Sequence, residues 1–401
     1  MRVEIKLRDD DSALEQAIRL VESSPKLSQK NKEIILSLKD ELSCSKARLR
    51  KYLQQWRFLG EWLGKDFTEA SEKDIKRLVN IIRSKYPDDL PNGKVRAKTR
   101  RDYKQALKLL YTLLEGEDGI PPKKVAWIKT GIPKKFRTPR IRMLTVEERI
   151  WLIESAKYLR DKAMVACLCD GLRPDELLYM RVGDVHVAKD GTAWAIVRGY
   201  KGTRRVDFIW GTPFLLQWIE HHPFKHNPFS PMWVHLRAKS ERDYIKYKRF
   251  EKIMKQVGER AQKIYGLSLE RVWAYLFRHV RATELAQYLT DAQMDEYFGW
   301  EKGSPMPQIY VHLSGKAVGN KVKKIAGIEV EEEDEETFKL KRCPVCKRVN
   351  PQHYERCYHC GEALDEKTIY EKKQEAILRL QNLLVENPEL FVALQELAKN
   401  K

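Results

Sequence analysis

The sequence lacks any apolar run that approaches the roughly 18 residues expected of a membrane-spanning helix. It begins with MRVEIKLRDDD, which has no apolar core of the kind that a secretory signal requires. These two absences argue against a membrane protein and against secretion. We therefore expect an intracellular protein.

Cysteine is scarce, with 7 residues in a chain of 401. In an intracellular protein, so few cysteines favour free thiols or a metal site over a disulfide framework. Acidic residues are also outnumbered, since 57 Asp and Glu face 76 Lys and Arg and leave a net charge of +19. This surplus favours a polyanionic partner, most simply nucleic acid. The alternative is a basic protein that is rich in charge in the way thermophile proteins are.

Strand-like patterns are few, and helical spacing dominates the first part of the chain. From Asn31 to about Gly119, apolar residues recur at intervals of three and four. Ser71 with Asp74 three residues later predicts a helix start that is capped on both sides. We therefore expect an N-terminal extension over residues 1–30 and an all-helical domain over residues 31–119.

The last helix of this domain is expected to begin with a concentration of positive charge. Such charge at a helix start opposes the helix dipole, and contact with phosphate would explain it. The alternative is a solvated basic face. The candidate DNA-binding residues are Lys94, Arg96, Lys98, Arg100, Arg101 and Lys104.

The rest of the chain divides by composition. Residues 120–142 are rich in proline and basic residues without periodicity, which predicts a linker. Residues 143–328 return to helical spacing, except that TAWAIVRGYKGTRRVDFIW predicts a β-hairpin. An acidic hinge is expected over residues 329–338, a cysteine-rich segment over 339–364 and a C-terminal helix with an apolar stripe over 365–401.

Four separated stretches share a family resemblance. In order and spacing, GLRPDELL, VRGYKGTRRV, YLFRHVRATELA and FGWEKGSPMPQIYVHLSG resemble the motifs of the tyrosine recombinases, which include integrases and Xer-type resolvases. The region over 31–119 looks like their core-binding domain. The resemblance implies a mainly helical fold with a small β-hairpin. It also implies a C-shaped DNA clamp made from the helical domain and an α+β catalytic domain, here followed by a zinc ribbon.

The resemblance assigns roles residue by residue. Arg173 and Arg278 match the two arginines that clamp the non-bridging oxygens of a phosphate, for which a guanidinium fork is suited. Lys201 matches the hairpin lysine that protonates the leaving 5′ oxygen. Tyr310 matches the nucleophile that forms a 3′-phosphotyrosyl bond. The resemblance implies that the reaction needs neither ATP nor a catalytic metal.

Four further residues stand near these positions. Glu176 follows Arg173 by about one helical turn and is expected to orient its neighbours. Trp300 falls where the family has His or Trp and would donate its indole N–H to phosphate. Tyr275 stands where the family usually has His, and archaeal integrases that resemble this chain show such a Tyr. Its phenol cannot replace imidazole as a base at neutral pH. His279 is expected to be structural, because one step along a helix points it away from the direction of Arg278.

A second signal is a pair of C-x-x-C knuckles. Their four thiolates resemble a zinc ribbon that holds one structural Zn²⁺ and leaves no coordination position open. The alternatives are disulfides or an iron–sulfur cluster. The candidate ligands are Cys343, Cys346, Cys357 and Cys360.

The sequence as a whole predicts a site-specific DNA recombinase, an integrase of a mobile genetic element, with archaeal features. The resemblance implies that four protomers act on double-stranded recombination sites through a Holliday junction. The protein is then expected to be associated with the nucleoid. Two alternatives remain. A type IB topoisomerase uses the same residue set, and a DNA-binding regulator keeps the fold without the chemistry, a reading that only Tyr275 favours.

Overall fold

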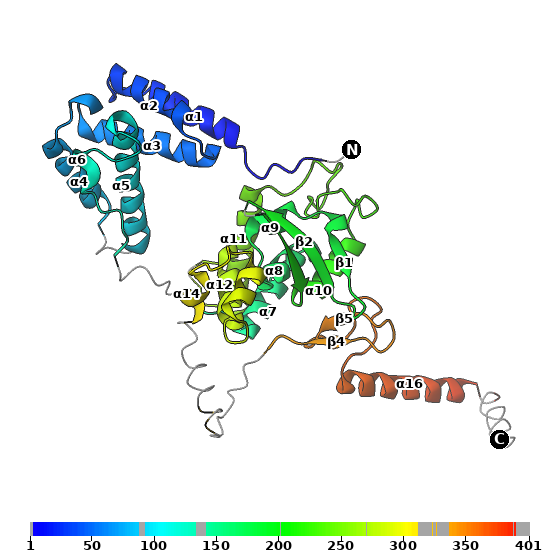
Figure 1. Ribbon diagram of the computed structural model, residues 1–401. Coiled ribbons are helices and arrows are strands. Elements are labelled where there is room, and N and C mark those ends of the chain that lie inside the picture. The colour runs from blue at the N-terminus through cyan, green and yellow to red at the C-terminus, as the bar shows by residue number, and fades with distance from the viewer. Residues whose placement is uncertain are drawn as a thin grey trace. The chain divides into compact units, whose positions relative to one another are not determined.

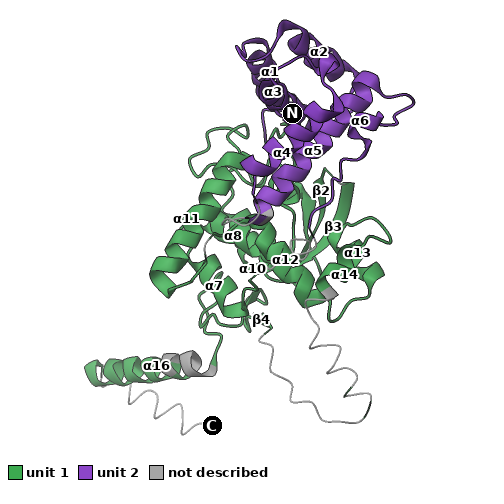
Figure 2. Cartoon of the chain, turned by 90° about the vertical axis from the view of Figure 1, so that its left-hand side faces the viewer, with its two compact units in different colours: residues 1–7, 141–401 green, residues 8–140 purple. Residues whose placement is uncertain are grey.

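A computed structural model describes residues 3–87, 93–133, 142–200, 202–269, 271–311 and 337–387, together with 323, 326 and 389. The chain forms two compact units, residues 8–140 and residues 1–7 with 141–401, which Figure 2 colours purple and green. Helices dominate the described residues, with one three-stranded and one two-stranded antiparallel sheet. The predicted mainly helical fold with a small hairpin is confirmed. The predicted domain borders and the clamp around DNA stay predictions.

No helix among the described residues combines the length and the apolar character that crossing a membrane requires.

The unit over residues 8–140 is helical throughout its described part (Figure 1). Its elements are α1 (Asp10–Glu22), α2 (Gln29–Glu41), α3 (Lys46–Leu63), the 3-10 turn η1 (Phe67–Glu69), α4 (Glu72–Lys85), α5 (Gly93–Glu115) and α6 (Lys123–Ala126).

Helices α3 and α5 carry the core of this unit. Trp56 on α3 is fully buried, and its indole N–H donates to the carbonyl oxygen of Ala106 on α5 at 2.9 Å. Tyr111 on α5 is buried as well and donates its hydroxyl to the carbonyl oxygen of Phe67 at 3.1 Å. These two buried polar groups therefore each have a partner, as a stable core requires. The expected capping of α4 by Ser71 and Asp74 is confirmed.

The helical unit includes residues that the sequence pattern assigns elsewhere. Ala17 and Val21 on α1 are buried in its core, so the stretch expected to be an extension contributes a helix. Val125 and Ile128 are buried there too, although they lie in the proline-rich stretch expected to be a linker. Because α6 is a single short turn, it has too few residues for a period to be visible in the sequence.

The unit over residues 1–7 and 141–401 holds the remaining motifs. In chain order its elements are α7 (Val146–Glu154), α8 (Leu159–Cys169), α9 (Pro174–Tyr179), η3 (Val182–Asp184), β1 (Val185–Val187), β2 (Ala193–Gly199), β3 (Gly202–Phe208), α10 (Gly211–Glu220), α11 (Tyr247–Tyr265), α12 (Ala274–Leu285), α13 (Asp291–Phe298) and α14 (Met306–Val311).

Helix α8 is the centre of this unit and packs against α7, α10 and α12. Residues Ala163–Cys169 are all buried, as expected for a helix covered on every side. At its end, the carboxylate of Asp170 accepts the backbone N–H groups of Ile209, Trp210 and Gly211 at 2.7–3.0 Å. This carboxylate thereby joins the end of α8 to the turn that enters α10.

The three strands form an antiparallel sheet in the order β1-β2-β3. In β3, Val206 and Phe208 are buried, whereas Arg205 and Asp207 are exposed and pair with each other at 2.6 Å. The alternation places Arg204 on the same face as Val206 and Phe208.

After residue 336 the chain forms a small cysteine-rich lobe with β4 (Leu340–Arg342) and β5 (Val349–Pro351), followed by α16 (Glu366–Glu386). The lobe packs against the rest of the same unit. Phe338 stacks on Trp210 with ring centroids 3.9 Å apart, and Tyr354 donates its hydroxyl to Glu154 on α7 at 3.0 Å. Arg348 pairs with Glu220 at the end of α10. The acidic hinge falls almost entirely outside the described residues.

Candidate active site

Glu176 is the carboxylate around which the site is built. The helix start RPDE puts Pro174 in the first turn, so that Glu176 can fold back on Arg173, the residue that precedes the helix. The Glu176 carboxylate accepts the backbone N–H of Arg173 at 2.7 Å and its guanidinium at 2.5 Å. It also accepts two bonds from the Arg204 guanidinium of β3, at 3.0 and 2.8 Å. The expectation that Glu176 orients its neighbours is consistent with these contacts.

Arg278 reaches the same place from α12. Its guanidinium donates to the carbonyl oxygen of Gly171 at 2.8 Å and to that of Phe298, and lies 3.8 Å from Glu176. Arg173 is held in a similar way, by a bond of 2.8 Å to the carbonyl oxygen of Gly299. Backbone carbonyls at the end of α8 and at the end of α13 therefore fix both arginines.

Gly299 adopts a backbone conformation that residues with a side chain rarely adopt. Its φ of +57° lies in the left-handed region, where side chains are disfavoured. A Cβ at this position would lie 2.9 Å from Cδ of Arg204 and 3.4 Å from the Arg173 guanidinium. Gly299 thus lets the chain turn in close contact with the side chains of Arg173 and Arg204.

The site holds more positive than negative charge. Burial, and then the charges of Arg173 and Arg204, lower the pKa of Arg278 to about 9. Burial alone would raise the pKa of the Glu176 carboxyl, but hydrogen bonding and the charge of Arg204 hold it below its usual value. Both groups are therefore ionised at neutral pH. The electrostatic cost of crowding three guanidiniums can be offset by a bound anion.

Tyr310 lies in this region on the short helix α14. Its side chain is buried, with 2% exposed, and its ring stacks on Trp300 with centroids 5.6 Å apart and planes 4° from parallel. Trp300 also lies 5.8 Å from the Arg278 guanidinium. Burial raises the pKa of the Tyr310 phenol to about 12, while the charge of Arg278 opposes the rise. The phenol is therefore protonated at neutral pH.

His279 contacts Tyr310, which sequence reasoning did not anticipate. Its Nδ1 lies 2.6 Å from the Tyr310 hydroxyl oxygen, and the two rings are 5.8 Å apart. Consecutive residues of α12 do point in different directions, but different elements cover those directions. Arg278 meets the carbonyls of Gly171 and Phe298, and His279 meets Tyr310.

Tyr275 lies at a more open edge of the site, with 42% exposed. Burial of part of its ring raises the pKa of its phenol, with Asp175 and Tyr247 acting in the same direction. It stays a neutral hydrogen-bond donor at neutral pH.

Lys201 lies outside the described residues. The residue before it, Tyr200, donates its backbone N–H to Asp175 on α9 at 2.9 Å. A Cβ on Gly199 would come within 2.6 Å of the same carboxylate. The described end of β2 is thus held against the helix that carries Glu176.

Arg204 is the site residue that sequence reasoning did not single out. Besides Glu176, it donates to the carbonyl oxygens of Tyr297 and Gly171. The alternation of β3, which puts Arg204 on the face of buried Val206 and Phe208, was the signal that could have identified it.

The basic residues at the start of α5 differ in their exposure and in their partners. Lys98 is exposed, whereas Arg100 donates to the carbonyl oxygen of Tyr86 at 3.3 Å and Arg101 pairs with Asp102 at 2.8 Å. Burial, and then the charges of Arg83 and Arg100, lower the pKa of Lys104. Arg96 is half-buried, and the side chain of Lys94 is outside the described residues. Contact between this group and DNA stays a prediction.

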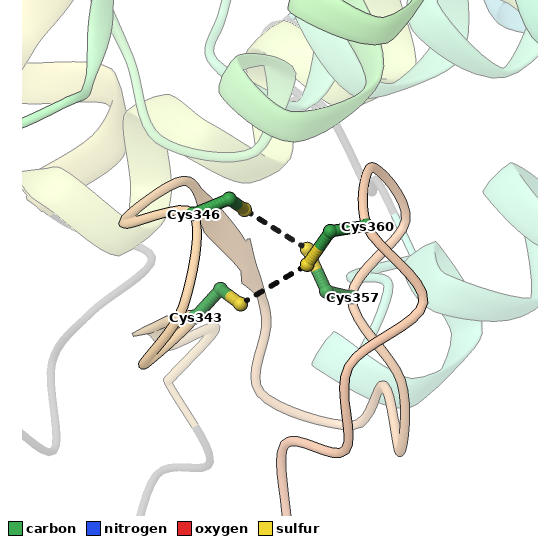
Figure 3. A group of neighbouring side chains, drawn as sticks. All are labelled: Cys343, Cys346, Cys357 and Cys360. Atoms are coloured by element: carbon green, nitrogen blue, oxygen red, sulfur yellow. Dashed lines mark hydrogen bonds between the residues drawn. The ribbon is translucent and has the colours of Figure 1, made fainter.

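The four cysteines gather as the sequence predicts. All four sulfur atoms lie within 4.8 Å of one another, with Cys343 and Cys346 on one knuckle and Cys357 and Cys360 on the other (Figure 3). The pairs Cys343–Cys360 and Cys346–Cys357 are 3.5 and 3.6 Å apart, which is too far for a disulfide. A tetrahedral metal at about 2.3 Å from each sulfur requires separations of about 3.8 Å, so the group fits one metal ion.

Residues 142–316 match the model of the phage integrase family. No curated protein sequence matches the chain.

Solved structures share the fold. The Tn1549 transposon integrase in complex with transposon right end DNA aligns with a TM-score of 0.56 at 13% identity, covering 74% of this chain and 100% of that one. The XerH site-specific recombinase bound to its palindromic difH substrate aligns with a TM-score of 0.51 at 18% identity, covering 82% and 99%. At these identities the likeness concerns the fold. Residues 142–316 of the chain thus form a domain of the phage integrase family, with the fold of the tyrosine recombinases.

Proposed function

We propose that the chain is a site-specific DNA recombinase that opens a phosphodiester with Tyr310 and rejoins it to another strand. The observation that carries this proposal is that one buried carboxylate, Glu176, gathers Arg173 and Arg204 with Arg278 at 3.8 Å. The charge of Arg278 in turn acts on the phenol of Tyr310. Guanidiniums that are positioned before the reaction stabilise the charge that develops on a five-coordinate phosphorus.

The proposed reaction has two symmetrical halves. Arg173 and Arg278 hold the non-bridging oxygens while the Tyr310 oxygen attacks phosphorus and the 5′ oxygen leaves. Lys201 supplies a proton to that leaving oxygen. Trp300 keeps the Tyr310 ring in place by stacking and can turn its indole N–H toward phosphate. The phosphotyrosyl bond preserves the energy of the broken linkage, so a 5′ hydroxyl from another strand can reverse the step.

Arg204 acts through Glu176 in this proposal and is a positioning residue. Its guanidinium donates four hydrogen bonds to protein oxygens, and its side chain is almost fully buried. Without it, the Glu176 carboxylate would be balanced by Arg173 and Arg278 alone. These two arginines would then be drawn away from the phosphate.

We also propose that the helical unit binds duplex DNA through the basic start of α5, and that four copies assemble on two recombination sites. Exposed apolar side chains on α16 support a contact between protomers: Tyr370, Ile377, Leu378, Leu380, Leu383 and Val385. An apolar face of this kind is stable in water only when it is covered.

The metal of the cysteine-rich lobe is proposed to be Zn²⁺, held by Cys343, Cys346, Cys357 and Cys360. Four thiolates leave no open position, so the ion would be structural. The ion would hold the lobe together. In this lobe Tyr354 contacts Glu154 of α7, and Arg348 pairs with Glu220 of α10.

The first prediction concerns Tyr310. Nicked duplexes with a randomised central segment are incubated with the full chain, and DNA that stays attached in detergent is amplified and sequenced. The wild type should yield one enriched sequence and a covalent adduct on denaturing gels. Tyr310→Phe should yield none, because it lacks the attacking oxygen, whereas Tyr288→Phe, on an exposed tyrosine, should behave as the wild type. An adduct that persists in Tyr310→Phe would contradict the assignment, and no wild-type adduct would favour a regulator.

The second prediction separates the two neighbouring arginines of β3. Arg204→Gln should lower the single-turnover rate of adduct formation by about 10²-fold at saturating DNA, a typical effect of losing electrostatic organisation. Arg204→Lys should recover only part of this loss, because an amine cannot reproduce the forked contact. Arg205→Gln, on the exposed face of the same strand, is the matched control and should change the rate little. Equal effects of the Arg204 and Arg205 variants would refute the role of Arg204.

The third prediction concerns the metal. Elemental analysis of the purified chain should find one zinc per protomer, and Cys343→Ser with Cys357→Ser should remove it. Cys44→Ser, outside the knuckles, should retain it. Because Phe338 stacks on Trp210, loss of the metal should also change the Trp fluorescence of the protein, and a Phe338→Ala variant should show the same change with zinc bound. Zinc retained by the double variant would exclude the site.

The fourth prediction concerns assembly. Deleting residues 365–401 should weaken the pairing of two DNA sites more than the binding of one site, since the apolar face of α16 would be gone. Native gels with one and with two labelled duplexes measure both quantities. A monomer that relaxes supercoiled DNA equally well with and without this segment would instead indicate a topoisomerase.

A further inference from the structure

The hydrogen bond between His279 and Tyr310 is the feature that the proposed function leaves unexplained. His279 Nδ1 and the Tyr310 oxygen are 2.6 Å apart, which is within the range of a strong hydrogen bond. The phenol must be the donor when it is protonated, so Nδ1 is the acceptor and the ring carries its proton on Nε2. The inference that follows rests on the proposed function and deepens it.

The nucleophile needs a group that removes its proton. Burial raises the pKa of the Tyr310 phenol to about 12, so almost none of it is ionised near pH 7. A protonated phenol is a weak nucleophile toward phosphorus. The proton must therefore leave as the oxygen attacks, and an acceptor within hydrogen-bond reach makes this efficient.

The other described groups of the site are poor acceptors. Arg173, Arg204 and Arg278 are cations. The oxygens of Glu176 are occupied by the bonds from Arg173 and Arg204. Of these four groups, Arg278 of α12 is the one whose charge acts on the Tyr310 phenol.

The aromatic neighbours cannot take the proton either. The Trp300 indole is a donor only, and Tyr275 keeps its own proton at neutral pH. Met294 and Phe298 of α13, which pack on Tyr310, are apolar. Among the described side chains around Tyr310, the imidazole of His279 is thus the group suited to accept a proton near neutral pH.

We propose that His279 is a catalytic base whose Nδ1 accepts the Tyr310 proton as the tyrosine oxygen attacks phosphorus. In this step the bond from the Tyr310 oxygen to phosphorus forms, and the bond from phosphorus to the 5′ oxygen breaks. The Tyr310 proton moves to Nδ1, and Lys201 gives a proton to the 5′ oxygen. In the reverse step the incoming 5′ hydroxyl gives its proton to Lys201, and His279 returns a proton to the departing phenolate oxygen. No oxidant, reductant or metal is needed to balance either step.

With His279 as the base, the reaction does not need a histidine at position 275, where this chain has tyrosine. Tyr275 lies at the more open edge of the site, where it can donate a hydrogen bond to phosphate but accept no proton. His279 is half-buried and contacts the Tyr310 hydroxyl, one residue after Arg278. The same helix then supplies a phosphate ligand and a base through neighbouring residues.

The test uses the full chain and the duplex that the wild type captures from the randomised pool. The variants are His279→Asn, whose side-chain oxygen can replace Nδ1 as a hydrogen-bond acceptor but takes no proton, and His279→Ala. His221→Ala, on an exposed histidine at the end of α10, is the control. Single-turnover rates of adduct formation are measured from pH 5.5 to pH 9 (roughly the span over which imidazole titrates), and circular dichroism verifies folding.

The expected result has three parts. Both His279 variants should lose about 10²-fold or more in rate. The wild-type rate should rise with pH as an imidazole loses its proton, because only the neutral ring can accept, and this rise should be missing in His279→Asn. Imidazole added to the buffer should restore part of the His279→Ala rate, which a purely structural role would not allow.

Other outcomes would overturn the inference. If His279→Asn keeps a rate within about threefold of the wild type with the same pH profile, His279 only holds the phenol in place. A duplex with sulfur in place of the 5′ bridging oxygen needs no proton on its leaving group. If it restores the His279 variants, the histidine serves the leaving group instead. A wild type that forms no adduct refutes the proposed function itself, which is a separate result.

Discussion

The ion pairs of Glu176 are the interactions on which the candidate site depends. Its carboxylate is buried on α9 and holds Arg173 from the same helix start and Arg204 from β3, with Arg278 of α12 at 3.8 Å. One negative charge thus gathers three positive ones where water screens them poorly. A buried arrangement of this kind stabilises a fold weakly, because desolvation offsets much of the attraction. Its unbalanced positive charge instead makes it suited to receive an anion such as a DNA phosphate.

The site is tied to the fold through backbone groups. The carbonyl oxygen of Gly171, just past α8, accepts bonds from Arg278 and Arg204, while the preceding residue, Asp170, caps the entry to α10. Gly171 and Gly299 both have left-handed backbone angles, which turn their carbonyls toward the arginines. Carbonyls in such turns move only if the helices move. The guanidiniums are therefore held before any substrate arrives, as preorganised catalysis requires.

Sequence reasoning found the residue types of the site and the order of its motifs, because these depend on the local chain. It could have found Arg204, since alternation along β3 places this residue with Val206 and Phe208. It could not find the contact of His279, because that contact depends on where α14 lies, and no local pattern specifies how a six-residue helix packs. For the same reason it missed α1 as part of the helical core. Val21 looks like any residue of a short amphipathic helix until its packing partners are known.

The burial of Tyr310 has two consequences that act against each other. Raising the phenol pKa from about 10 to about 12 adds roughly 3 kcal/mol to the cost of removing its proton, which keeps the residue unreactive when no phosphate is present. The same burial places the hydroxyl against His279 and keeps water away, so that a hydrogen bond there is stronger than it would be in solvent. In the proposed reaction, a phosphate seated on the arginines supplies the missing negative charge. The imidazole then takes the proton, and the nucleophile becomes active only where DNA is bound.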